Sequence, residues 1–278
     1  MITRFAPSPT GPLHLGHAYS ALLAHDMAMV ASGTFLLRIE DIDQSRSRPE
    51  WAAQIYDDLT WLGLSWPEPV MRQSERANEY KAALERLWSL DLLYPCTCSR
   101  RDVQDALGAP QEGAPLHGPD GLIYPGTCRD RSKQAAMPDA VLRLDMSKAA
   151  RKISFIEEVG IAKKHTFLPE TLITSIGDVV LARRDMGTSY HLSVVVDDAE
   201  QQVSHVVRGK DLAPATPIHV LLQSLLGLPT PVYHHHKLIR DEAGKRLAKR
   251  DDARAITKYR DAGVTPEGIR ELLNLPPR

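Results

Sequence analysis

The sequence has no long apolar run, no leader-like start and almost no net charge. No stretch of about 18 consecutive apolar residues occurs in the chain, which excludes a hydrophobic membrane-spanning helix. The first residues lack a basic stretch followed by an apolar one and a small-residue cleavage site, so we expect a cytoplasmic protein. The formal charge of -1 provides no global field for a polyanion, so any contact with RNA depends on local basic patches.

Cysteine is also scarce. The chain has 3 cysteines, and an odd number without a secretion signal argues against a disulfide framework. Cys96, Cys98 and Cys128 all lie in one segment, which favours a metal site because zinc takes four Cys or His ligands in a tetrahedron. His117 is the generic choice for the fourth ligand. Three reduced cysteines without a metal are the alternative interpretation.

Strand-like and helix-like segments alternate through the first part of the chain. They are, in order, the strand ITRFAP, a helix over 16–32, the strand TFLLRIED, and helices over 49–64 and 74–90. This order is typical of a parallel sheet with helical crossovers.

The alternation stops in the Gly/Pro-rich stretch GAPQEGAPLHGPDG and returns near Ser189. No internal repeat is present. We therefore predict an α/β nucleotide-binding domain with a parallel sheet, formed by residues 1–95 and 181–250. An insertion covers residues 96–180, and a short helical segment covers residues 251–278.

The segment PSPTGPLHLGH, residues 7–17, lies between the first predicted strand and the first predicted helix. In an open parallel sheet, a loop from a strand's carboxyl end into a helix points backbone N–H groups at an anion. Glycines let the backbone approach a phosphate, and prolines keep the loop in one shape. His14 and His17 can face the same way and donate hydrogen bonds to phosphoryl oxygens. A structural histidine pair is the plainer interpretation of this fragment alone.

The longer stretch RFAPSPTGPLHLGHA resembles the first signature of class I glutamyl-tRNA synthetases, whose four-residue ATP motif stands here as HLGH. GKRLAKRDD is similar to the second signature, K-M-S-K-S, with Arg246 and Lys249 at the positions of its two lysines. Arginine keeps the positive charge, whereas alanine in place of the serine removes one hydroxyl. The resemblance implies a class I synthetase Rossmann-like domain with His14, Gly16, His17, Arg246 and Lys249 at ATP. It implies catalytic roles for His14, His17 and Lys249.

Three adjacent histidines, His234, His235 and His236, precede this second signature. On a strand, neighbouring side chains point to opposite faces, so at most two of them could share one metal ion. We interpret the run as a strand that forms a wall of the nucleotide pocket and assign it no metal.

Free glutamate presents two carboxylates and an ammonium, so a selective pocket needs a guanidinium and a carboxylate close together. By resemblance, the family's glutamate-binding residues stand here as Arg4, Phe5, Ala6, Pro7, Ser8, Glu40, Tyr190 and Arg208. Taken singly, Glu40 and Arg208 are ordinary ion-pair candidates, and Tyr190 is a core residue with a hydrated hydroxyl.

The chain stops about 30 residues after Lys249, whereas an ordinary glutamyl-tRNA synthetase continues into a helical anticodon-binding domain, which we do not expect here. In this respect it is similar to the short glutamyl-queuosine tRNA(Asp) synthetases. In that family a Y-P-G-T-C pattern, present here at 124–128, supplies a tyrosine ligand. The resemblance therefore implies an acceptor-type insertion with one structural Zn²⁺ on Cys96, Cys98, Tyr124 and Cys128.

The same resemblance implies activation of L-glutamate by ATP and Mg²⁺ without tRNA, and transfer to the queuosine base at the wobble position of tRNA(Asp). The substrate carboxylate is already a nucleophile, so the protein needs to hold it in line and stabilise phosphate charge. We expect a monomer with no membrane partner. The alternatives are a truncated ordinary glutamyl-tRNA synthetase, another H-x-G-H nucleotidyl-transferring enzyme, or a non-catalytic RNA-binding paralogue.

Overall fold

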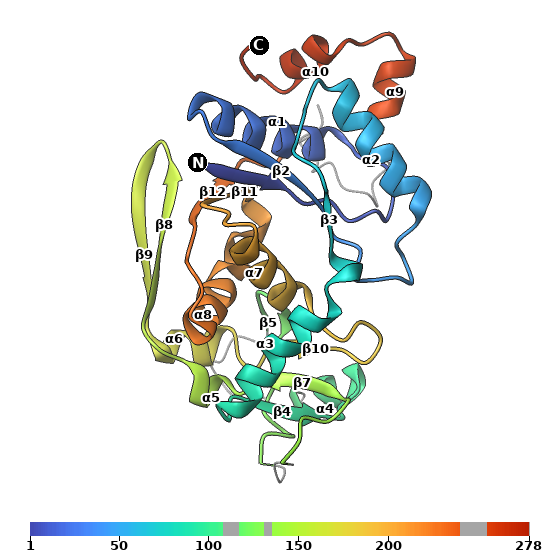
Figure 1. The fold of residues 1–278 in the computed structure, drawn as a ribbon. Coiled ribbons are helices and arrows are strands. Elements are labelled where there is room, and N and C mark those ends of the chain that lie inside the picture. The colour runs from blue at the N-terminus through green and yellow to red at the C-terminus, as the bar shows by residue number, and fades with distance from the viewer. Residues whose placement is uncertain (108–116, 131–134, 240–254, 278) are drawn as a thin grey trace.

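The computed structural model describes residues 1–107, 117–130, 135–239 and 255–277 (Figure 1). Two parallel ladders form its main sheet: β3-β2-β1 and β11-β12-β8, with β9 pairing antiparallel to β8 at the edge. The strands are β1 (Ile2–Phe5), β2 (Thr34–Ile39), β3 (Met71–Arg72), β8 (Ile153–Val159), β9 (Ile161–Phe167), β11 (His205–Gly209) and β12 (Val232–His236). The parallel sheet predicted from the alternation is confirmed.

The two ladders adjoin at β1 and β11. Ser204, which directly precedes β11, donates its backbone N–H to the carbonyl of Ile2 at 3.0 Å. The chain therefore winds outward from β1 in one direction and from β11 in the other. In such sheets, ligands bind in the crevice at the carboxyl ends of the two strands where the winding reverses.

Helices connect and cover the strands of this sheet (Figure 1). They are α1 (Leu15–Val30), α2 (Pro49–Trp61), α3 (Ala77–Ser89), α7 (Tyr190–Glu200) and α8 (Thr216–Leu226), with 3₁₀ turns η1 (Gln73–Glu75) and η2 (Lys210–Ala215). α8 ends at Gly227, whose φ of 71° is the left-handed conformation that glycine adopts readily at a helix end. None of the helices in the described residues combines the length and apolarity needed to cross a bilayer.

The helix predicted over 74–90 is shorter than expected. α3 begins at Ala77, and the 3₁₀ turn η1 precedes it. Asp41 explains the difference, because its carboxylate accepts hydrogen bonds from the Ser74 backbone N–H at 2.8 Å and from the Ser74 hydroxyl at 2.9 Å. These bonds tie the turn to the end of β2 and delay the start of the helix.

The expected insertion contains a small antiparallel sheet, β10-β7-β4, and the hairpin β5-β6. The elements of this region are β4 (Leu93–Cys96), α4 (Arg100–Leu107), β5 (His117–Gly118), β6 (Gly121–Leu122), β7 (Val141–Leu144), α5 (Met146–Ala149), α6 (Pro169–Ser175) and β10 (Val180–Ala182), so its sheet begins before residue 96 and ends after residue 180. β8 and β9 also lie within residues 96–180, but they extend the parallel sheet, since Tyr233 of β12 pairs with Glu157. A boundary drawn by strand pairing therefore assigns 153–167 to the main sheet.

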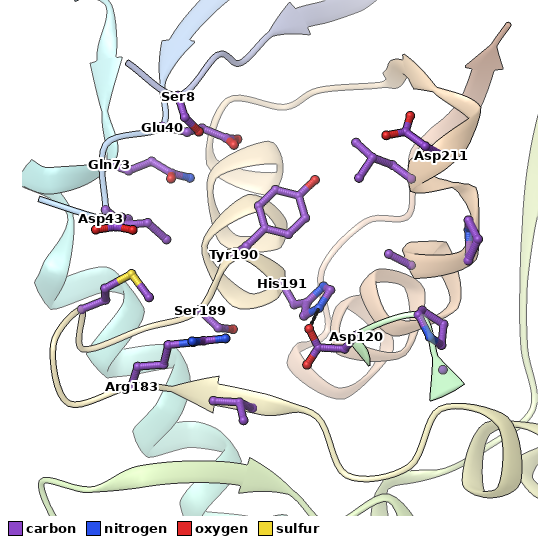
Figure 2. Close-up of a pocket in the computed structure, with 18 of the residues that line it drawn as sticks. Ser8, Glu40, Asp43, Gln73, Asp120, Arg183, Ser189, Tyr190, His191 and Asp211 are labelled. Carbon is purple, nitrogen blue, oxygen red and sulfur yellow. Dashed lines mark hydrogen bonds and ion pairs between the residues drawn. The ribbon is translucent and has the colours of Figure 1, made fainter. Parts of the chain in front are cut away.

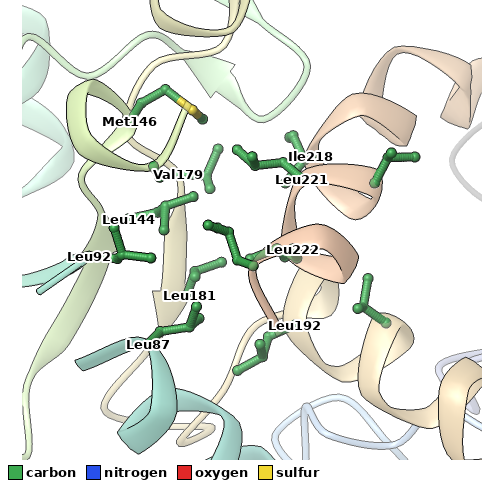
Figure 3. Close-up of a cluster of buried hydrophobic side chains, with 14 of the residues drawn as sticks. Leu87, Leu92, Leu144, Met146, Val179, Leu181, Leu192, Ile218, Leu221 and Leu222 are labelled. Carbon is green, nitrogen blue, oxygen red and sulfur yellow. The ribbon is translucent and has the colours of Figure 1, made fainter. Parts of the chain in front are cut away.

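One apolar core joins the insertion to the part of the chain that carries the parallel sheet (Figure 3). Leu144 of β7 and Leu181 of β10 are fully buried against α7 and α8, which contribute Leu192 and Leu222. Burying a leucine contributes roughly 1.5–3 kcal/mol, so this shared core holds the insertion firmly against α7. The relative positions of residues on the β5-β6 hairpin and on α7 depend on it.

The described C-terminal region consists of two short helices, α9 (Ile256–Asp261) and α10 (Pro266–Leu272). They bury Ile256 and Ile269 in the same apolar cluster as Leu22 of α1. The short helical C-terminal region predicted from the sequence is therefore present and packs beside α1.

Candidate active site

A cavity of about 320 Å³ opens where β1, β2 and β11 end. The loops at these carboxyl ends and the first residue of α7 supply its walls. All eight residues assigned to glutamate line it: Arg4, Phe5, Ala6, Pro7, Ser8, Glu40, Tyr190 and Arg208. His17 and Ser20 of α1 line it as well. The structure thus brings the predicted set together at the place where the winding of the sheet reverses.

Arg4 is held by a buried carboxylate. Its Nε and Nη2 donate to Asp198 Oδ1 and Oδ2 at 2.9 and 3.3 Å, and both residues are buried. Asp198 Oδ1 also accepts from Arg38 Nη1 at 2.8 Å. Burial alone would raise the pKa of Asp198, but Arg4 and Arg38 hold that pKa below its usual range. Asp198 therefore remains ionised and neutralises one of the two arginines.

Glu40 is joined to Arg4 and Asp198 through Arg38. Arg38 Nη2 donates to Glu40 Oε1 at 3.1 Å. Burial raises the pKa of Glu40, and the attraction of Arg38 and Arg4 offsets only part of that rise. Arg4, Asp198, Arg38 and Glu40 form an alternating row of charges. Asp197 lies 3.9 Å from Arg38 Nε and is itself paired with Arg76 at 2.8 Å, so the six groups together sum to zero. A carboxylate at the cavity wall can bind an ammonium group directly.

Arg208 has a different environment, because all of its partners are neutral. Its Nε, Nη1 and Nη2 donate to His235 Nε2 at 3.3 Å, His219 Nδ1 at 3.1 Å and Thr216 Oγ1 at 2.7 Å. Burial and the charge of Arg208 lower the pKa of both histidines, that of His235 to about 4. No carboxylate among the described residues forms an ion pair with Arg208, which is 5% exposed. Glu157 reaches Arg208 only through His235, whose Nδ1 lies 2.6 Å from Glu157 Oε1, so the positive charge of Arg208 has no direct counter-charge among the described residues.

A second cavity of about 960 Å³ adjoins the first (Figure 2). The two share Ser8, Glu40 and Tyr190, and the Tyr190 side chain projects into the space between the walls in Figure 2. The larger cavity continues to Asp120 of the β5-β6 turn and to Arg183 after β10. It extends the small pocket toward the insertion.

The two histidines of the HLGH motif cap α1. His14 Nδ1 accepts from the Gly16 backbone N–H at 3.1 Å, and His17 Nδ1 accepts from the His14 backbone N–H at 3.2 Å. When neutral, both rings therefore carry their proton on Nε2, which makes that atom a donor. A Cβ on Gly16 would lie 3.0 Å from the His14 ring, a tight contact that glycine at this position avoids.

The second signature falls outside the described residues, and with it Arg246 and Lys249. The residues that directly follow the gap lie beside the HLGH motif. Ala255 pairs with His14 in an isolated β-bridge, and Ile256 donates its backbone N–H to the carbonyl of Leu13 at 2.9 Å. The chain thus returns to the first signature immediately after the second.

The three adjacent histidines lie on a strand, as predicted, because β12 covers Val232–His236. His235 contacts Arg208, and His236 Nε2 lies 2.7 Å from the hydroxyl of Ser20, a residue of the small cavity wall. Among the described residues, the three histidines belong to no group with metal-ligand spacing.

The three cysteines converge in the insertion. The sulfur atoms of Cys96, Cys98 and Cys128 lie within 4.8 Å of one another and form a cluster that could hold a metal ion. Tyr124 Oη lies 3.5 Å from Cys96 Sγ and 3.2 Å from Cys98 Sγ. His117 instead lines the larger cavity, and the cluster found among the described residues contains no histidine.

Sequence reasoning missed two groups of residues that support this site. Asp197 and Asp198 stand together in the apolar helix segment YHLSVVVDD, and this pairing was a usable signal for buried, partnered carboxylates. Asp120, His191 and His219 carried no such signal. Their contacts join segments that lie far apart in the chain, His191 to Asp120 at 3.3 Å and His191 to His219 at 3.1 Å.

Comparisons with known proteins identify the family of the chain. The family described as tRNA synthetases class I (E and Q), catalytic domain, matches residues 1–276. The chain is 64% identical to the glutamyl-Q tRNA(Asp) synthetase of Rhodobacter capsulatus over 99% of this chain and 100% of that relative. It is 43% identical to the protein of the same name from Nocardia farcinica, covering 99% and 85%.

Among solved structures, the chain is similar to a glutamate tRNA ligase from Elizabethkingia meningosepticum in complex with its amino acid. The TM-score is 0.74 at 28% identity. The match covers 96% of this chain but 59% of that ligase, so the chain spans less than two thirds of it.

Proposed function

Because the chain belongs to the class I tRNA synthetases of the E and Q group, a family of ligases, we propose that it activates L-glutamate with ATP in the absence of tRNA. It then transfers the glutamyl group to the queuosine base at the wobble position of tRNA(Asp), in the cytoplasm. The name shared by its relatives supports this acceptor. The charge of the small cavity supports the amino acid.

One observation carries the choice of glutamate. The row Arg4–Asp198–Arg38–Glu40 is neutral, whereas Arg208 has only neutral partners, so the pocket has a net charge of one positive unit. Glutamate is a monoanion at neutral pH and matches this charge, whereas glutamine is neutral. Leaving a buried guanidinium unpaired costs several kcal/mol, so the pocket favours the acid over the amide.

The residues that line the small cavity then have distinct roles. Glu40 binds the substrate ammonium, Arg208 binds a substrate carboxylate, and Tyr190 and the backbone from Arg4 to Ser8 shape the pocket. The remaining carboxylate faces ATP. His14 and His17 donate to phosphoryl oxygens from Nε2, and Lys249, with Arg246, neutralises the charge that develops on the phosphates. Mg²⁺ accompanies ATP.

The cysteine cluster fits one structural Zn²⁺ held by Cys96, Cys98, Tyr124 and Cys128. Zinc–sulfur bonds of about 2.3 Å in a tetrahedron place the sulfur atoms about 3.8 Å apart. The observed Cys98–Cys128 separation of 3.5 Å and the two Tyr124 contacts are close to that geometry. Four protein ligands leave no open position, so the ion would stabilise the insertion rather than take part in the reaction.

Two assays test this function. The first is exchange of pyrophosphate into ATP without tRNA, which should require L-glutamate and should not occur with L-glutamine. The second supplies ATP and labelled glutamate together with tRNA(Asp) carrying queuosine, tRNA(Asp) carrying guanine, or tRNA(Glu). Only the first tRNA should be labelled. Efficient charging of tRNA(Glu) would identify the chain as an ordinary glutamyl-tRNA synthetase, and loss of exchange altogether would favour a non-catalytic paralogue.

A further inference from the structure

A chain of hydrogen bonds leads from Arg208 to the wall of the larger cavity. Arg208 Nη1 contacts His219 Nδ1 at 3.1 Å, and His219 Nε2 contacts His191 Nδ1 at 3.1 Å. His191 Nε2 then contacts Asp120 Oδ1 at 3.3 Å, the interaction drawn as a dashed line in Figure 2. Three separate elements meet here: the β5-β6 turn, α7 and α8.

The direction of every bond in this chain follows from its two ends. An arginine only donates, so His219 Nδ1 must accept. The proton of neutral His219 is therefore on Nε2 and is donated to His191 Nδ1. His191 in turn carries its proton on Nε2 and donates it to the Asp120 carboxylate, which can only accept. Removing the carboxylate leaves His191 without the partner that fixes its tautomer.

The consequence reaches the glutamate pocket. If His191 moved its proton to Nδ1, it would face the Nε2 proton of His219, and two donors cannot share a hydrogen bond. His219 would then have to present a donor to Arg208, which would release one end of the guanidinium. Both histidines are buried, at 7% and 2% exposure, so water cannot easily replace the lost contact.

The arrangement also explains how Arg208 keeps its charge for the substrate. Arg4 pairs directly with Asp198, whereas among the described residues the carboxylates linked to Arg208 act only through histidines: Glu157 through His235, and Asp120 through His191 and His219. A carboxylate linked in this way orients the guanidinium through the histidines without neutralising it. Second-layer groups commonly act in this way on residues that bind a charged ligand.

We propose that Asp120, acting through His191 and His219, positions the Arg208 guanidinium for a substrate carboxylate and so contributes to the selection of glutamate over glutamine. This positioning role rests on the proposed function and adds residues from the insertion to the amino-acid pocket. Asp120 and His191 are positioning residues, since neither lines the small cavity.

The test compares steady-state pyrophosphate exchange in four variants. Asp120→Ala and His191→Phe break the chain, Asp120→Asn keeps an acceptor oxygen, and Asp185→Ala removes an exposed carboxylate from the wall of the same cavity. In the first two, KM for L-glutamate should rise about tenfold while kcat stays within about twofold. Their preference for glutamate over glutamine should fall by the same factor.

The matched variants separate positioning from general disturbance. Asp120→Asn should restore KM to within about threefold of wild type, and Asp185→Ala should leave it unchanged. An Asp120→Ala enzyme with wild-type KM would overturn the proposal. So would a loss confined to kcat, or an Asp120→Asn variant as impaired as Asp120→Ala.

A second measurement does not depend on activity. Long-range ¹H–¹⁵N spectra of the histidine rings, with His219 assigned from a His219→Gln variant, report the tautomer directly. Wild-type His219 should carry its proton on Nε2, and Asp120→Ala should alter this signal whereas Asp185→Ala should not. A proton on Nδ1 in the wild type would overturn the relay. Absence of glutamate-dependent exchange in the wild type would instead count against the proposed function and leave this spectrum to decide the relay.

Discussion

Replacing Asp58 by asparagine should remove a pH-dependent loss of stability. Asp58 lies on α2 with 0% exposure, and neither of its carboxylate oxygens has a hydrogen-bond partner. Burial, together with the nearby charge of Asp57, raises the pKa of Asp58 from 3.8 to about 6, and Arg260 opposes this only partly. The folded state therefore holds a proton that the unfolded state loses at lower pH.

The sign follows from the order of the two pKa values. Between about pH 4 and pH 6 the folded protein binds more protons than the unfolded chain, so its stability falls as the pH rises through this window. A rise of about two pKa units corresponds to about 3 kcal/mol, at 1.36 kcal/mol per unit. Above about pH 6 the folded protein remains destabilised by this full amount. Asparagine does not titrate, so the stability of Asp58→Asn should not fall in this way as the pH rises.

Urea unfolding followed by circular dichroism at a series of pH values measures the effect. The free energy of unfolding of Asp58→Asn minus that of wild type should increase by up to about 3 kcal/mol from pH 4 to pH 7. Glu50→Gln is the control, because Glu50 is an exposed carboxylate on the same helix, and it should show no such change. A difference that stays constant across the range would refute the assignment of a protonated, buried Asp58.

Three further predictions concern the site. Purified protein should contain about one zinc per chain, and Cys128→Ser should lose it; full zinc content in that variant, measured by plasma emission, would rule out this ligand set. Arg208→Leu should weaken glutamate use by several kcal/mol while changing the melting temperature less than Arg4→Leu, which also removes one of the two arginines paired with the buried Asp198; equal glutamate KM values in both variants and wild type would remove the arginines from the pocket. Lys249→Ala should slow pyrophosphate exchange about a hundredfold, with a smaller effect for Arg246→Ala, and an unchanged rate would contradict a role at the phosphates.

The motifs of the chain could be interpreted without coordinates because their residues are neighbours in the sequence. RFAPSPTGPLHLGHA is one unbroken segment, and its prolines, glycines and histidines predict a phosphate loop at a helix start. The three cysteines also fall within one short part of the chain, so a metal site could be inferred from their clustering, whereas Tyr124 was added by the family resemblance of the Y-P-G-T-C pattern. The order of strands and helices predicted a parallel sheet, and the structure confirms it.

The sequence by itself thus predicted a phosphate loop before α1, a candidate metal site on the clustered cysteines and the class of sheet, since each depends on local spacing and periodicity. Only the tertiary structure decided which of the two pocket arginines pairs with a carboxylate and which contacts neutral groups. Arg4 meets Asp198 across 194 residues, and Arg208 meets histidines from α8 and β12. Such pairings depend on the order in which strands and helices pack, and no local pattern specifies which distant side chains will share a low-dielectric interior.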